Sequence, residues 1–346
     1  MGSVLAAVKL TNQQVAAGNN FPRNRSVDSK VHLIITALDY KRTKNPLTCT
    51  KDGRNMGKLA EACQVEDVHT MYDEECTKEN VKRKIQMVGR QCRSDDFFIF
   101  YYSGHGVNMK DQSGDEKDGE DEAFCFVTPD GQITVESCMV DDDFSHCLIE
   151  SVPDDVQIVI LTDCCHSGTI ADLDSPSWGT RKAISITGCL DNQTSGDMGR
   201  GGIFTHSMLL AIAKLKQAGE AQYSVGALFN ATLSEDNRVF NSAQDITIQC
   251  SAGVSPDGME WPLVPVMAYR APLSHAAEAA GGDSVSGTDL QQATELCEAL
   301  GINPGLLQHV TSAVINALPD NYQAAIRPMM PTLFAVLTVA VKKICG

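Results

Sequence analysis

Runs of apolar residues alternate with amphipathic stretches through the first half of this chain. Three runs are almost wholly aliphatic or aromatic, as strands buried on both faces are, and they cover residues 31–38, 95–102 and 157–161. Between the first two lie a short strand-like run at 68–72 and two stretches with helical spacing of apolar residues, 52–62 and 77–91. This succession predicts an α/β fold with a central, mostly parallel sheet flanked by helices.

The pattern changes after residue 105. Seven of the twelve residues from 111 to 122 are acidic, and alternation over 123–135 predicts a hairpin around Pro129-Asp130-Gly131. A helix is expected to start at Val140. Further elements are expected as strands at 181–187 and 246–251 and as helices at 202–217 and 225–235.

The domain organisation follows from these patterns. Residues 1–30 are polar and mixed, and we expect a short N-terminal arm there. One α/β domain is predicted over 31–271, followed by a linker rich in Ala, Gly and Ser at 272–287. Apolar residues recur at helical spacing in 288–346, which predicts a small C-terminal helical region.

Composition narrows the possible partners and compartment. The 346 residues carry a formal net charge of −16, which argues against nucleic acid and anionic membrane surfaces as partners. The 13 cysteines are odd in number and form no C-x-x-C pair, so we expect neither a zinc site nor a disulfide scaffold. The first residues lack the pattern of a signal peptide, and no apolar run reaches membrane-spanning length. We therefore expect a cytoplasmic protein without a membrane span.

Two predicted strands end in residues that could carry chemistry. The strand beginning at Gln157 ends at Asp163-Cys164-Cys165, where we expect a turn into a helix whose N–H groups favour a thiolate. The strand before it ends at Ser-Gly-His105-Gly106, whose glycines permit unusual φ angles. Carboxyl ends of parallel strands meet at one edge of a sheet. We therefore predict that a cysteine nucleophile lies there with His105 as its base, and that the N–H groups of Gly106 and Cys165 are the oxyanion donors. Taken singly, a structural histidine or a buried apolar cysteine pair would be the simpler explanation.

These motifs resemble those of the caspase-like cysteine peptidases and, among them, the metacaspases. The similarity covers Tyr-Tyr-Ser-Gly-His-Gly at 101–106, Asp-Cys-Cys-His-Ser-Gly at 163–168 and the segment 185–195. It implies a caspase-like sandwich with a large-subunit-like part over 31–178 and a small-subunit-like part over 181–271. It also implies a monomeric endopeptidase without a long N-terminal prodomain, in which Cys165 attacks, His105 is the base, an acyl-enzyme forms, and Cys164 has no catalytic role.

The resemblance further implies activation by calcium, which would not itself be catalytic. The aspartates at the matching places are Asp121, Asp141, Asp142 and Asp172, with Glu120 as the alternative to Asp121 because loop lengths vary. Hard oxygen ligands from several segments suit this ion. The acidic run does not form an EF-hand, because a loop with Gly119 in sixth place would begin at a glycine. The simpler alternative is a solvated acidic loop.

A basic substrate side chain would solve an electrostatic problem in the predicted site. Asp163 shares a strand face with Cys165, and a carboxylate there opposes thiolate formation unless a cation is present. The resemblance implies cleavage after Arg or Lys, with a pocket built from Cys49, Asp52, Ser103 and Asp163. For Asp52 alone, a helix N-cap is an equally good interpretation.

Activation and alternative functions complete the expectations. Arg181-Lys182 lies where caspase-like chains are often cut, so self-cleavage there is plausible. A second hypothesis is a catalytically silent, calcium-responsive interaction module acting through its helical tail. A third is a redox-sensing scaffold that uses the many thiols. The presence of both His105 and Cys165 favours the peptidase.

Overall fold

The computed structural model describes residues 29–110, 120–165, 168–188, 201–240, 242 and 245–272. The expected N-terminal arm up to residue 28, most of the linker and the C-terminal helical region lie outside the described residues. Most of the acidic run lies outside them as well.

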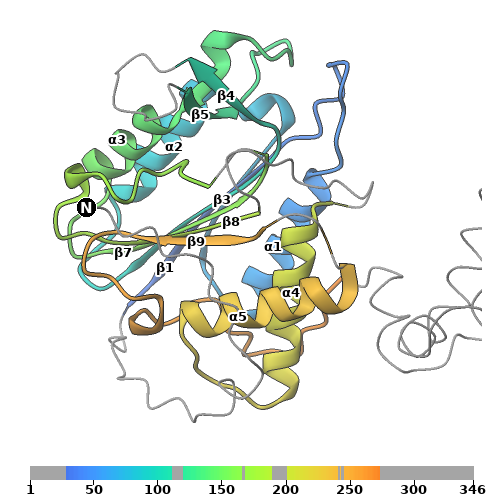
Figure 1. The fold of residues 1–346 in the computed structure, drawn as a ribbon, viewed down its shortest axis with the longest axis vertical. Helices are drawn as coiled ribbons and strands as arrows, with labels where there is room; N and C mark the ends of the chain where they lie inside the picture. Colours follow the sequence, from blue (N-terminus) through green and yellow to red (C-terminus); the bar gives the residue numbers. More distant parts are fainter. Residues whose placement is uncertain are drawn as a thin grey trace, which may run out of the picture. The chain divides into compact units, whose positions relative to one another are not determined.

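A six-stranded sheet with the strand order β2-β1-β3-β7-β8-β9 forms the centre of the described part (Figure 1). All neighbouring strands are parallel except β9, which pairs antiparallel with β8. The mostly parallel sheet predicted from the sequence is therefore confirmed. The strands are β1 (Val31–Ala37), β2 (Asp67–Tyr72), β3 (Phe97–Ser103), β7 (Gln157–Asp163), β8 (Lys182–Thr187) and β9 (Thr247–Cys250).

Helices cover both faces of this sheet. Figure 1 shows α2 and α3 on one side and α1, α4 and α5 on the other. The helix α2 starts as expected, because the Thr77 side chain accepts a hydrogen bond from the N–H of Asn80 and caps the first turn. The helices are α1 (Thr50–Ala62), α2 (Lys78–Gly89), α3 (Asp141–Ser151), α4 (Ile203–Gln217) and α5 (Val225–Glu235).

The strands are buried on both faces, which is why they read as continuous apolar runs. Phe98, Phe100 and Ile160 pack with Ile85 and Phe144, which α2 and α3 contribute, in one buried cluster. Burying a side chain of this size stabilises the fold by about 1.5–3 kcal/mol. This core fixes the strand ends at which the candidate chemistry lies.

A second, smaller sheet differs from the expected hairpin. It has the order β4-β5-β6, with β4 at Gly106–Lys110, β5 at Glu120–Cys125 and β6 at Cys138–Val140. The hairpin predicted over 123–135 is therefore displaced, since its second arm is β6 and the 3₁₀ turn Val135–Ser137 precedes it. The strand β4 was not predicted, because its polar residues lack a period-two apolar pattern.

The prediction of a helix directly after Cys165 is also wrong for the residues that the structure describes there. Residues 168–175 form bends and turns, and the first helical turn is the 3₁₀ segment Pro176–Trp178. Asp172 has a φ of 43°, a left-handed conformation that interrupts a right-handed helix. A helix dipole beginning at this segment is therefore not what favours the thiolate.

Candidate active site

His105 and Cys165 are brought to the same edge of the sheet by the pairing of β3 with β7. Ser103 and Asp163, two residues before each of them, are directly paired in the register of these strands. Behind His105, a Cβ atom placed on Gly106 would lie 1.9 Å from the carbonyl oxygen of Cys165. Both dyad residues are half-buried. The two segments therefore touch, although His105 and Cys165 are 60 positions apart in the sequence.

The ring of His105 has a defined tautomer. Its Nε2 lies 2.8 Å from the backbone oxygen of Asn45. A carbonyl oxygen can only accept a hydrogen bond, so Nε2 carries the proton and Nδ1 is left as the basic nitrogen. Asn45 thereby orients the imidazole.

Two tyrosine hydroxyls hold the backbone of His105, and we call this arrangement the tyrosine clamp. The N–H of His105 donates to Tyr40 Oη at 2.9 Å, and Tyr102 Oη donates to the His105 carbonyl at 2.7 Å. Tyr40 Oη in turn donates to the carbonyl of Cys125 at 2.7 Å, and the Cys125 N–H donates to the His105 carbonyl at 3.0 Å. The Tyr40 ring also lies against the imidazole, with 4.5 Å between the ring centres. Sequence reasoning assigned no role to Tyr40.

The two glycines around His105 are required for space. A Cβ on Gly104 would lie 2.5 Å from Tyr40 Oη and 2.6 Å from Tyr102 Oη. Gly106 faces the Cys165 carbonyl in the same way. Neither glycine has a positive φ, so the unusual backbone conformation expected from the sequence is not observed.

The predicted pocket residues lie together below this edge. Asp52 and Asp163 are buried, with exposed fractions of 0% and 3%. Ser103 Oγ donates to Asp52 Oδ2 at 3.1 Å. Burial raises the pKa of Tyr101, and the negative charges of Asp52 and Asp163 raise it further.

The N-terminus of α4 contacts both acids. The N–H of Gly202 donates to Asp52 Oδ2 at 2.8 Å, and Thr205 donates to Asp163 Oδ2 through its N–H at 2.8 Å and its hydroxyl at 2.7 Å. The positive end of the helix dipole favours ionised carboxylates here. The alternative in which Asp52 caps α1 is not observed, because Asp52 is the third residue of α1 and Cys49 occupies the N-cap position.

One further residue of this pocket was missed from the sequence. His206 is buried, and its Nδ1 lies 3.0 Å from the Gly202 carbonyl and 3.7 Å from Asp52 Oδ1. A histidine within an apolar helix gives no local signal of a functional position. Only the packing of α4 against α1 brings it beside the acid.

Some of the predicted calcium ligands form a buried acidic group with Glu122. Asp121 and Asp141 are buried, and the Glu122 N–H donates to Asp141 Oδ2 at 2.9 Å. Burial raises the pKa of Asp141 to about 6, and the charge of Asp121 acts in the same direction. Asp142 is exposed and Asp172 is half-buried. Among the described residues, no three His, Cys, Asp or Glu side chains already converge as a metal-holding group.

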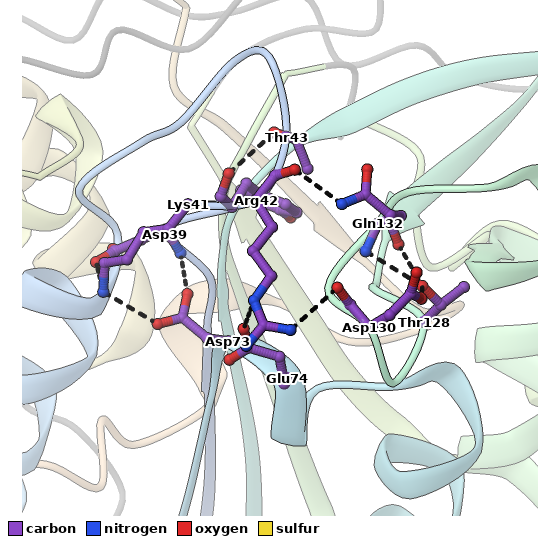
Figure 2. Close-up of polar contacts among 10 residues, drawn as sticks. Asp39, Lys41, Arg42, Thr43, Asp73, Glu74, Thr128, Asp130 and Gln132 are labelled. Atoms are coloured by element: carbon purple, nitrogen blue, oxygen red, sulfur yellow. Dashed lines mark hydrogen bonds and ion pairs between the residues drawn. The ribbon is translucent and has the colours of Figure 1, made fainter.

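Polar contacts anchor the β1–α1 loop, residues 38–49, which carries Tyr40, Asn45 and Cys49. Figure 2 shows Asp39 and Asp73 around Lys41, whose Nζ lies 3.0 and 3.3 Å from their carboxylates. Asp39 also accepts the N–H and hydroxyl of Thr50 at 2.7 and 2.8 Å, which ties the loop to the first turn of α1. Although burial alone raises the pKa of Asp39, the hydrogen bonds from Thr50 and Lys41 lower it overall.

The same loop is tied to the turn at residues 128–132. Arg42 Nε lies 3.0 Å from Glu74 Oε1, and its guanidinium donates to the Asp130 carbonyl at 3.3 Å (Figure 2). Gln132 Nε2 donates to the Arg42 carbonyl at 2.8 Å. These contacts fix the loop that orients His105.

Both residues of the predicted self-cleavage site make contacts within the fold. The Arg181 guanidinium pairs with Asp154 at 2.5 Å and donates to the Ile149 carbonyl at 3.0 Å. Lys182 is the first residue of β8 and is paired with Gln157. Both residues therefore lie at the end of the sheet opposite to its carboxyl edge, where β7 and β8 begin.

These features define a caspase-like α/β protein with a cysteine and a histidine at the carboxyl edge of its sheet. A family profile described as "Metacaspase, peptidase C14 domain" matches residues 31–174. Residues 31–174 are therefore similar to the peptidase domain of the metacaspases, a family of cysteine peptidases. No helix among the described residues is long and apolar enough to cross a membrane.

Individual relatives agree with this assignment. Metacaspase-2 of Arabidopsis thaliana is 28% identical over 253 residues, which cover 62% of this chain and 58% of the relative. Metacaspase-1 of the same plant is 33% identical over 143 residues, or 35% of this chain and 38% of the relative. The chain thus aligns with less than two thirds of the length of either protein. A crystal structure of a Geobacter sulfurreducens protein matches with a TM-score of 0.52 and 20% identity, covering 68% of this chain and 99% of that one, which supports the fold alone.

Proposed function

We propose that this protein is a calcium-activated cysteine endopeptidase that cleaves peptide bonds after Arg or Lys. The observation that carries the proposal is the contact of the His105-Gly106 and Cys165 segments, with His105 Nε2 bound to the Asn45 carbonyl. That contact leaves Nδ1 as the base for the neighbouring thiol.

The chemistry follows from this geometry. Cys165 Sγ transfers its proton to His105 Nδ1 and attacks the substrate carbonyl carbon. The N–H groups of Gly106 and Cys165 donate to the developing oxyanion. The Cys125 N–H bonds the His105 carbonyl within the β4–β5 ladder, so the next residue, Gly106, directs its N–H away from β5, which supports this role. The imidazolium then protonates the leaving amine, and water hydrolyses the acyl-enzyme.

The preference for Arg or Lys rests on the buried acids. Asp52 and Asp163 place two carboxylates in a largely desolvated region, where a substrate guanidinium or ammonium forms stronger charge-assisted bonds than in water. A basic side chain would also offset the field of Asp163 on the Cys165 thiolate. Cys49 and Ser103 would complete the pocket wall.

Calcium activation is supported by the buried acidic group on β5 and at the start of α3. Asp121 and Asp141 offer hard oxygen donors that suit calcium, and Asp142 lies beside them at the helix start. The Thr169 hydroxyl donates to Glu122 Oε2 at 2.5 Å, which links this group to the segment after Cys165 that carries Asp172. Calcium held by Asp121, Asp141, Asp142 and Asp172 would neutralise the acids and fix that segment beside the active site.

Self-cleavage after Arg181 or Lys182 would be a later step. The Arg181 side chain must first leave Asp154, and the start of β8 must detach from β7. We therefore propose that processing follows activation and is not needed for it. The chain is proposed to act as a cytoplasmic monomer, for which sedimentation and cell fractionation are the tests.

A reporter assay tests the main proposal. The full chain is incubated with matched fluorogenic peptides ending in Arg, Lys or Asp, with millimolar calcium or with chelator, beside Cys165→Ala. Calcium-dependent cleavage of the Arg and Lys peptides that vanishes in the mutant is expected. Equal cleavage of the Asp peptide would contradict the pocket, and cleavage unchanged by chelator would contradict calcium activation. Calcium binding without any turnover would favour the silent interaction module.

A further inference from the structure

Two cysteines outside the proposed dyad face each other behind His105. Cys125 on β5 and Cys138 on β6 are directly paired in the antiparallel register of the small sheet. Both are buried, and the Cys138 thiol donates to the Thr134 carbonyl at 3.3 Å. They are reduced in this structure. The peptidase mechanism uses neither thiol.

The backbone geometry at this pair suits a cross-strand disulfide. The Cys125 N–H points to the His105 carbonyl on the β4 side, so towards β6 the residue occupies a non-hydrogen-bonded position. Such pairs have Cα atoms about 4.5 Å apart and bring their side chains closest. A disulfide spans Cα distances of about 4.4–6.8 Å, so this bond can form without separating the strands.

The two thiols differ in pKa and in exposure. The adjacent Cys125 thiol and the Lys78 ammonium lower the pKa of Cys138, against the opposing effects of burial and of Glu136. The adjacent Cys138 thiol and burial raise the pKa of Cys125. Cys138 is also the more exposed of the two, at 6% against 1%. Cys138 is therefore the better nucleophile, and Cys125 is the partner that can resolve its oxidised form.

We propose that Cys125 and Cys138 form a second reactive site of this protein, a dithiol that a small peroxide oxidises to a disulfide. The Cys138 thiol releases its proton, the thiolate attacks one oxygen of hydrogen peroxide, and the O–O bond breaks to give a sulfenic acid and hydroxide. That hydroxide takes up the released proton and becomes water. Cys125 sulfur then attacks the Cys138 sulfur, the S–O bond breaks, and the departing hydroxide takes the Cys125 proton to give a second water. Two thiols are oxidised and one peroxide is reduced. A dithiol reductant reverses the reaction.

This site is connected to the dyad through the backbone of Cys125. That residue donates its N–H to the His105 carbonyl, and its own carbonyl accepts the Tyr40 hydroxyl, which accepts the N–H of His105. Disulfides most often span Cα distances of about 5.5–6 Å, wider than the roughly 4.5 Å of such a pair, so closing the bond shifts Cys125 relative to these partners. Oxidation is thus expected to loosen the tyrosine clamp. This consequence for catalysis rests on the proposed function, whereas the disulfide itself does not.

Peptide mapping tests the site without any need for turnover. Full-length Cys165→Ala protein is treated with hydrogen peroxide, alkylated with N-ethylmaleimide, digested without reduction and analysed by mass spectrometry. A peptide pair joined through Cys125 and Cys138 is expected, and dithiothreitol should release it. The pair should be lost in Cys138→Ser and retained in Cys147→Ser, which removes another buried thiol. Thermal melting of each variant shows that it is folded.

The outcomes test separately whether the disulfide forms and whether it affects catalysis. Absence of the linked pair in the folded Cys165→Ala protein, or linkage of Cys125 to a different cysteine, would overturn the proposal. Reporter cleavage by proteins that keep Cys165 tests the coupling. Peroxide should lower cleavage by the wild-type protein more than cleavage by Cys138→Ser, when only the part of the loss that dithiothreitol restores is compared. An equal restorable loss in both proteins would overturn the coupling to His105. If neither protein turns over substrate, the proposed function fails while the mapping result still stands.

Discussion

Removing a single oxygen atom at Tyr40 tests the idea that the tyrosine clamp positions the catalytic base. In Tyr40→Phe the ring can still lie against His105, but the hydrogen bonds of its hydroxyl to the His105 N–H, the Cys125 carbonyl and Tyr102 Oη, of 2.9, 2.7 and 2.9 Å, disappear together. The His105 N–H then loses this partner, which costs roughly 1–3 kcal/mol for a buried group left unsatisfied, whereas the Cys125 carbonyl still accepts from Tyr102 Oη at 3.3 Å. With partial relaxation, we expect the free energy of unfolding to fall by about 2 kcal/mol.

The effect on catalysis should exceed the effect on binding. Tyr40 has a φ of 53°, a left-handed conformation that is strained for a bulky residue, and its hydroxyl helps to hold it there. Without that hydroxyl, the backbone of His105 can shift relative to Cys165. A misplacement of about 1 Å can cost roughly 100-fold in rate. We therefore expect kcat to fall by about 10- to 100-fold while KM for an Arg reporter changes by less than about threefold.

The assay combines steady-state kinetics across pH with the rate at which iodoacetamide alkylates Cys165. Slower alkylation and a displaced acid limb of kcat/KM are expected, because both report the proton transfer between Cys165 and His105. Tyr223→Phe is the matched control, since Tyr223 is buried and its hydroxyl has no hydrogen-bond partner in the part of the chain that the structure describes. If Tyr40→Phe keeps the wild-type pH profile and alkylation rate, the clamp is merely structural and the reasoning is refuted.

Four further predictions concern the surrounding structure. Gly106→Ala should abolish both alkylation of Cys165 and reporter cleavage, because the added methyl would lie 1.9 Å from the Cys165 carbonyl oxygen; a fully active variant would contradict the close approach of the two segments. Asp163→Asn should raise KM for Arg peptides by at least about tenfold, since one buried charge is lost from the pocket, and unchanged KM would exclude this residue from it. Asp39 has a lowered pKa, so its contribution to stability is present above the unfolded-state pKa and is lost as pH falls through the still lower folded-state value. Chemical unfolding from about pH 6 down to about pH 2 should therefore show a weaker acid destabilisation in Asp39→Asn than in wild type. Asp141→Asn should raise the Tm in chelator, because it removes one of several buried like charges, and should abolish any rise in Tm on adding calcium; a calcium response that persists would exclude Asp141 as a ligand.

The order and type of most elements were predictable from local patterns. The strands β1, β3 and β7 are continuous apolar runs because helices cover both faces of the sheet, and α5 spans the residues expected from its spacing. The polar strand β4 and the turns after Cys165 were missed. In both places the backbone conformation depends on neighbours that are distant in sequence, and no local periodicity encodes it.

The sequence by itself determined the similarity to metacaspases, the mostly parallel sheet and the residues placed at its carboxyl edge, because apolar periodicity and short motifs are local properties. Only the tertiary structure decided that Tyr40 contacts His105 across 65 residues, that the start of α4 contacts Asp52 across 150, and that Cys125 faces Cys138. These contacts depend on strand order, on register and on how helices pack over the sheet. A shift of one residue in the register of β5 and β6, for example, would take Cys125 and Cys138 out of their paired positions.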